Sequence, residues 1–260
     1  MKRSILAGIF LALLLTGCSA KSLPNPTSTL QPGQGAAAPM GGTFLNEKIP
    51  ANILGITFFD STGKKFTLGS LAGKTIVLSN FLTSCQEICP MTTANMRDIG
   101  DAVAASSAKA QVEVLELSVD AGRDDVSRLK AYADLFNDSN FTLASGTFKG
   151  LKDFWTYFGA PPVVVKMDKA DAAKSPVDWQ TGKPLTYDVS HADLIVIVGP
   201  DSTWKWLDLG APSAKSPIPA KLKAFLTADG LANLVKAQEP SWSVPTALAA
   251  LSQLIGSKIS

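Results

Sequence analysis

Short apolar segments alternate with amphipathic segments between residues 56 and 207, and this pattern predicts the main elements of the fold. Segments rich in β-branched and aromatic side chains, bounded by turn residues, are typical of strands. The predicted strands span 56–59, 65–68, 75–82, 112–119, 141–143, 194–198 and 203–207, with 185–188 as an edge strand. Asp60-Ser61-Thr62-Gly63 predicts a hairpin between the first two strands. Gly199-Pro200-Asp201-Ser202 predicts the turn between the last two.

Apolar residues at helical spacing, such as Leu129, Tyr132 and Phe136, lie in the segments between these strands. Asp124 or Asp125 is expected to cap the helix that contains them, and Ser243 the last helix of the chain. The predicted helices span 91–105, 124–136, 149–158, 221–226, 231–238 and 245–255. The alternation predicts an α/β fold with a central mixed sheet flanked by helices, an N-terminal hairpin and a C-terminal helical extension.

The first residues of the chain predict its compartment. Lys2 and Arg3 precede the apolar stretch 5–15, which is short for a membrane span and typical of a secretory signal. Leu15-Thr16-Gly17-Cys18 resembles the lipobox of bacterial lipoproteins, in which the chain is cut before a cysteine that becomes lipidated. We therefore expect a signal peptide at 1–17 and an extracytoplasmic protein that Cys18 anchors to the bacterial cell membrane.

The composition of the remaining chain changes twice. Residues 18–45 are rich in Pro, Gly, Ala, Ser and Thr, which is typical of a flexible tether. A single domain is expected at 46–210 and the helical extension at 211–260, whose predicted helices are too short to span a membrane. Loss of Lys2 and Arg3 from 24 basic residues leaves 22, against 22 acidic residues. This balance gives no basic stripe for nucleic acid.

Two cysteines and the only histidine of the chain lie next to predicted core strands. Cys85 and Cys89 follow the strand at 75–82, and His191 precedes the strand at 194–198. Two thiolates and an imidazole suit a soft metal such as Cu(I), whereas two thiols alone suit disulfide exchange. A structural disulfide is a third alternative, but closing so short a loop would stabilise the fold little.

The motifs around these residues resemble those of a known family. In chain order they are Cys85-Gln86-Glu87-Ile88-Cys89-Pro90, Leu117-Ser118-Val119-Asp120, Arg123-Asp124, Arg128-Leu129-Lys130-Ala131-Tyr132, and the segment from His191 to Asp201. The combination resembles the Sco/SenC family, thioredoxin-like copper chaperones for assembly of cytochrome c oxidase. The resemblance covers about 58–207. It implies that Cys85, Cys89 and His191 bind copper, as Cu(I) or Cu(II), and that the partner is an oxidase subunit with a copper site.

Three positions depart from the family pattern. Gln86 replaces a common proline, Ser190 stands where an acidic residue often precedes the histidine, and Ala121 replaces another proline. A metal-binding imidazole is usually oriented by a neighbouring hydrogen-bond partner. Asp188, Asp193 and Asp120 are the candidates for that role.

Two functions remain open for the cysteine pair. A metallochaperone would hold copper with Cys85, Cys89 and His191, and would not be an enzyme. A thiol-disulfide oxidoreductase would use Cys85 and Cys89 to reduce the cysteines of an oxidase copper site or of another exported protein. His191 distinguishes these functions, because copper retention requires the imidazole and dithiol exchange does not. The absence of a proline directly before 194–198, where thioredoxins carry a cis-proline, favours the chaperone.

Overall fold

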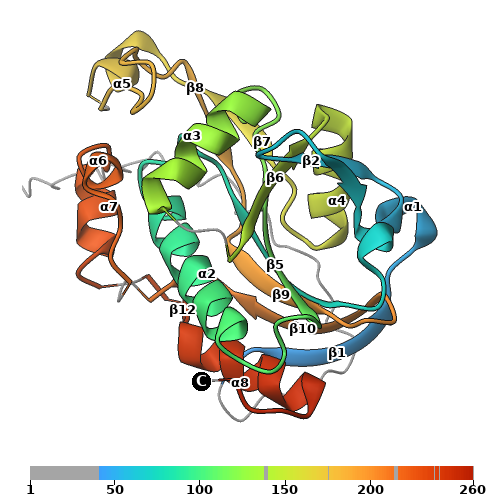
Figure 1. Cartoon of the computed structure of the whole chain (residues 1–260). Coiled ribbons are helices and arrows are strands. Elements are labelled where there is room, and N and C mark those ends of the chain that lie inside the picture. The colour runs from blue at the N-terminus through green and yellow to red at the C-terminus, as the bar shows by residue number, and fades with distance from the viewer. Residues whose placement is uncertain are drawn as a thin grey trace, which may run out of the picture.

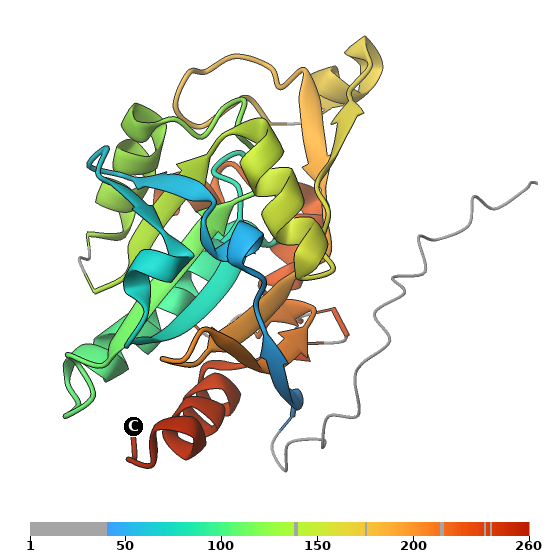
Figure 2. The same ribbon diagram turned by 90° about the vertical axis from the view of Figure 1, so that its right-hand side faces the viewer.

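The computed structural model describes residues 41–137, 140–174, 176–213, 216–236, 238–239 and 241–259. The predicted signal peptide at 1–17, the predicted lipidation site Cys18 and most of the predicted tether therefore lie outside the described residues. The described part contains the complete predicted domain apart from these short gaps (Figures 1 and 2).

A mixed sheet forms the centre of the molecule. Its strands are β1 (Thr43–Lys48), β2 (Thr57–Asp60), β3 (Lys65–Thr67), β4 (Thr75–Phe81), β5 (Val112–Ser118), β6 (Thr142–Gly146), β9 (Leu194–Val198) and β10 (Thr203–Leu209). They lie in the order β1-β10-β9-β4-β5-β6-β2-β3. Strands β4, β5 and β6 are parallel, and β9 runs antiparallel to β4. The predicted central mixed sheet and the β2–β3 hairpin are confirmed.

Helices cover both faces of this sheet. They are α1 (Ala51–Leu54), α2 (Cys89–Ala104), α3 (Val126–Phe136), α4 (Phe148–Tyr157), α5 (Lys169–Lys174), α6 (Ala220–Lys223), α7 (Ala228–Asn233) and α8 (Val244–Ile255), with a 3₁₀ turn at Leu68–Leu71. In Figure 1, α2, α3 and α8 lie on one side of the sheet, and α1 and α4 on the other. This arrangement confirms the predicted layers and the C-terminal helical extension.

The alternation of side chains along the strands explains the two layers. Val77 and Ile195 pack against residues of α2 and α8, whereas Leu78 and Val196 belong to the cluster that contains Phe154 of α4. Every residue of β4 and β9 is buried, as is usual for central strands covered on both faces. All five tryptophans are buried, as expected of packing residues.

Two predicted helix caps are confirmed. The Asp125 carboxylate accepts a hydrogen bond from the backbone N–H of Arg128, and Ser243 accepts one from Thr246. Each satisfies a backbone donor that has no partner within its own helix. Among the described helices, none has both the length and the apolar character needed to cross a membrane.

Several elements differ from the predictions. Strand β1 begins at Thr43, so the last residues of the predicted tether belong to the sheet, where they pair with β10. The predicted edge strand at 185–188 is β8 (Tyr187–Ser190), which pairs with β7 (Val163–Lys166) in a separate two-stranded arm. Figure 2 shows this arm projecting from the body near α5.

Another difference concerns the helix predicted at 231–238, because α7 begins at Ala228 and ends at Asn233. The Thr227 side chain accepts a hydrogen bond from the backbone N–H of Gly230 and thereby caps the helix earlier than the apolar pattern indicates. A short parallel pair, β11 (Ala211–Pro212) and β12 (Ser241–Trp242), was also missed. It leads the chain into α8, which packs against α2.

Candidate metal centre

The loop after β4 carries both cysteines to the first turn of α2. Cys89 is the first residue of this helix, and Pro90 follows it at a position where the missing N–H costs no helical hydrogen bond. Ile88, the residue before the helix, contributes no side-chain cap. Instead, the Cys85 Sγ accepts hydrogen bonds from the backbone N–H groups of Ile88 (3.4 Å) and Cys89 (3.3 Å). The first cysteine thus occupies the place of a helix cap.

This position makes the two sulfurs chemically different. The pKa of the Cys85 thiol is lowered, mainly by its hydrogen bond with the Cys89 thiol and further by the backbone N–H groups of the loop, although burial opposes the change. Burial and the neighbouring Cys85 sulfur raise the pKa of Cys89. Both cysteines are free thiols, Cys85 partly buried and Cys89 1% exposed. Cys85 is therefore the sulfur that more readily carries negative charge.

His191 follows β8 and lies beside the central strand β4. Its Nδ1 lies 3.2 Å from the Nδ2 of Asn80, 3.2 Å from its neighbour's carbonyl oxygen, Ala192 O, and 3.9 Å from the Oδ1 of Asp193. Asn80 also donates to Ala192 O (2.7 Å) and accepts from the backbone N–H of Leu194 (3.3 Å). A single buried amide thus fixes the segment that carries the imidazole, whose side chain is 6% exposed.

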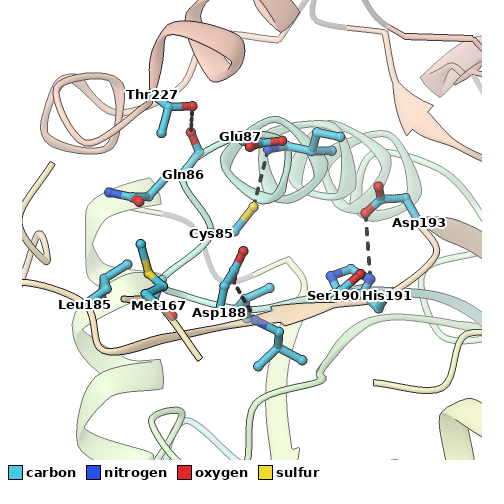
Figure 3. Close-up of a pocket in the computed structure, with 14 residues that line it drawn as sticks. Cys85, Gln86, Glu87, Met167, Leu185, Asp188, Ser190, His191, Asp193 and Thr227 are labelled. Atoms are coloured by element: carbon cyan, nitrogen blue, oxygen red, sulfur yellow. Dashed lines mark hydrogen bonds and ion pairs between the residues drawn. The ribbon is translucent and has the colours of Figure 1, made fainter. Parts of the chain in front are cut away.

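Cys85 and His191 line the same pocket, which has a volume of about 350 Å³ (Figure 3). The pocket is also lined by the carboxyl groups of Glu87, Asp188 and Asp193 and by the hydroxyl of Thr227. Burial raises the pKa of Glu87, and the nearby Asp229, Asp188 and Asp193 raise it further. The pocket is therefore bordered by closely spaced carboxyl groups.

The structure assembles the predicted site only in part. Cys85 and Cys89 are in hydrogen-bond contact, and His191 faces the same pocket as Cys85. However, within the described part of the chain, no three His, Cys, Asp or Glu side chains are placed so that they could hold one metal ion. Two sulfurs and a nitrogen are a suitable donor set for Cu(I). Bringing all three onto one ion requires a movement of His191 or of the cysteine loop.

The three predicted carboxylates lie in different surroundings. Asp193 is the one beside the imidazole, and Asp188 lines the pocket while accepting from the backbone N–H of Val189. Asp120 does not reach the ring. It accepts from the Arg123 side chain, from the Tyr187 hydroxyl (2.9 Å) and from a backbone N–H in its own turn. Asp120 is therefore linked through Tyr187 to β8, the strand that precedes His191.

Sequence reasoning missed a buried polar network behind the cysteine loop. Thr83 donates its backbone N–H and its hydroxyl to the Asp124 carboxylate, and Arg128 Nε donates to the Thr83 hydroxyl (2.5 Å). Both guanidinium Nη groups of Arg128 donate to Asp178 (3.1 and 2.5 Å). Trp179 Nε1 donates to the Thr83 carbonyl (2.7 Å). Two residues before Cys85, the loop is thus held by α3 and by the segment 176–183.

A central mixed sheet with a cysteine pair at the N-terminus of the helix after its central strand defines a thioredoxin-like domain. The model of the SCO1/SenC family matches residues 54–224, and the chain belongs to this family.

Relatives were found among known proteins and solved structures. The SCO1 protein homolog of Bacillus subtilis (strain 168) is 27% identical over 164 residues, which cover 62% of this chain and 75% of that protein. A Stutzerimonas stutzeri protein that bears the name "Putative copper-binding protein" is 25% identical over 144 residues, which cover 55% of this chain and 62% of that protein. The chain therefore spans less than two thirds of this second relative. The copper-bound ScoI of Bradyrhizobium japonicum is 21% identical, with a TM-score of 0.48, over 65% of this chain and 93% of that one.

Proposed function

We propose that the protein is a copper chaperone that binds one copper ion through Cys85, Cys89 and His191 and delivers it to a cytochrome c oxidase subunit. The observation that carries this proposal is that Cys85, in contact with the thiol of Cys89, opens into the pocket that His191 lines. Membership of the SCO1/SenC family and the name of the Stutzerimonas stutzeri relative support copper as the metal that this protein binds.

The donor set accounts for the chemistry of loading. Copper stabilises thiolate sulfur, so binding releases the proton that burial retains on Cys89. The contacts of His191 with Asn80, Ala192 and Asp193 are all at Nδ1, which leaves Nε2 as the ligand atom. The carboxyl groups around the pocket favour the approach of a cation. Loading is completed when His191 and the two sulfurs close onto the ion.

The predicted signal sequence and lipobox at the beginning of the chain support a proposal for where the protein acts. We propose that Cys18 is lipidated and anchors the protein to the outer side of the bacterial cell membrane, with the segment up to Gly42 as the tether. An extracytoplasmic position would bring the pocket to oxidase subunits whose copper sites face the same compartment.

A second candidate function is thiol-disulfide exchange, and the asymmetry of the two sulfurs favours it. The Cys85 thiolate would attack a disulfide of the target and release one target thiolate. Cys89 would then displace the second target sulfur from the mixed disulfide, so that the target gains two electrons and a Cys85–Cys89 disulfide forms. The lowered pKa and greater exposure of Cys85 suit the attacking sulfur, and the buried Cys89 suits the resolving one.

Copper stoichiometry on the reduced chain from residue 18, with Cys18→Ser to remove the third thiol, tests the proposal. We expect one copper per chain, and a large loss of affinity in His191→Ala and in Cys89→Ser. Reduction of a model disulfide by the same proteins provides the comparison. Copper retention without His191, together with undiminished disulfide reduction, would favour the oxidoreductase instead.

A further inference from the structure

The cysteine loop is contacted by a segment that lies beyond the family match, which ends at residue 224. The backbone carbonyl of Gln86, the residue after the first cysteine, accepts hydrogen bonds from the backbone N–H (2.9 Å) and the hydroxyl (3.3 Å) of Thr227. Thr227 also lines the pocket, and Figure 3 shows it directly beside Gln86. The start of α7 therefore borders the site itself.

Gly230, in the first turn of α7, fits closely against the same loop. A Cβ at this position would overlap the carbonyl oxygen of Gln86 and would lie 3.0 Å from the Cα of Glu87. Gly230 is buried and does not have a positive φ, so its backbone conformation alone does not require glycine. The lack of a side chain is explained by the close approach of the helix to the loop.

The opposite side of the loop is held as well. The Gln86 side-chain amide donates to the carbonyl of Pro176 (2.8 Å). Gln86 is thus fixed from two directions, by its side chain to the segment 176–183 and by its carbonyl to Thr227. Gln86 lies between the two cysteines, in the loop whose Ile88 and Cys89 N–H groups donate to the Cys85 sulfur.

We infer that Thr227 and Gly230 are positioning residues that clamp the cysteine loop against the first turn of α2. The clamp keeps Cys89 covered and holds the Cys85 sulfur at the N-terminus of the helix. It deepens the proposed copper function and rests on that function for its purpose, but its geometry requires no metal. The C-terminal extension is thereby a part of the site.

Hydrogen exchange of the Ile88 and Cys89 amides in the reduced, metal-free chain from residue 18 with Cys18→Ser measures opening of the loop. We expect roughly three- to tenfold faster exchange in Thr227→Val, the factor that corresponds to one net hydrogen bond. Gly230→Ala should have at least this effect. Helix propensity alone favours alanine in α7 and so predicts the opposite direction. Alkylation of Cys89, followed by peptide mass spectrometry, should accelerate in parallel.

Two matched variants control for general effects. Thr227→Ser retains the hydroxyl and should exchange like the original chain, and Ala232→Ser alters an exposed position of the same helix. Unchanged exchange at Ile88 and Cys89 in Thr227→Val would overturn the clamp. So would faster exchange that extends equally to the amides of β4 and β5, because that result indicates general destabilisation.

Copper titration of the same proteins separates this inference from the proposed function. Faster exchange in a chain that never binds copper would overturn only the copper function. Normal copper binding with unchanged exchange would overturn only the clamp.

Discussion

Replacement of Asp178 by asparagine removes the charge from the buried pair that fastens the segment 176–183 to α3. The Asp178 carboxylate is 5% exposed, accepts both Nη groups of Arg128, and also accepts from the backbone N–H of Thr181 (2.8 Å). Although burial opposes it, the hydrogen bonds from Arg128 and Thr181 lower the pKa of Asp178 from 3.8 to about 2. At about 1.4 kcal/mol per pH unit, this difference corresponds to roughly 2.5 kcal/mol of stability.

The pH dependence gives the prediction its sign. Because the folded pKa lies below the unfolded one, the contribution is fully present above pH 4 and is lost as the pH falls through 2. We expect Asp178→Asn to lower the free energy of unfolding by about 2.5 kcal/mol at pH 7 and by about half as much at pH 3. Urea unfolding of both proteins at these two pH values measures the difference.

A difference in free energy of unfolding between the two proteins that is the same at pH 3 and pH 7 would refute the reasoning. A difference below about 0.5 kcal/mol at pH 7 would refute it as well. The first result would mean that the lost stability does not depend on the charge of Asp178. The second would place the ion pair among those that contribute nothing measurable. Gln180→Ala provides a control, because its exposed side chain contacts the same guanidinium at 3.3 Å but carries no charge.

Two further predictions concern the neighbours of the site. Asn80→Ala should weaken copper binding about 10- to 100-fold, since it removes the amide that fixes the His191 segment; isothermal titration measures it, and unchanged affinity would exclude Asn80 as the orienting residue. Burial, followed by the nearby Asp120, raises the pKa of Asp124 to about 6. The contribution of Asp124 to the free energy of unfolding is therefore complete below pH 4. As the pH rises through 6, up to about 3 kcal/mol of this contribution is lost. Asp124→Asn should remove this part of the pH dependence in urea unfolding, and an identical profile would contradict it.

Local signals in the sequence were sufficient for most of the fold. Apolar runs of β-branched residues predicted β4, β5 and β9, because strands covered on both faces have to be apolar throughout. Asp125 and Ser243 marked helix starts because a cap acts on a backbone donor only three residues away. The same local chemistry placed Cys85 and Cys89 at the beginning of α2.

The contacts that position the site could not be predicted in this way. Gln86 and Thr227 are separated by 141 residues, and Arg128 and Asp178 by 50. Nothing in the local pattern around either partner indicates such a pair. Asn80 lies within an apolar strand, and its hydrogen bonds to Ala192 and Leu194 form only when β9 packs beside β4 in the folded sheet. Strand β7 was not predicted, and the edge strand predicted at 185–188 pairs with β7 rather than with the central sheet.

X-ray absorption of the copper-loaded protein tests the proposed ligand set most directly. The spectrum of the chain from residue 18 with Cys18→Ser should fit two sulfur ligands and one nitrogen ligand, and His191→Ala should lose the nitrogen while keeping both sulfurs. A spectrum that is the same with and without His191, or one with fewer than two sulfurs, would contradict the site of Cys85, Cys89 and His191.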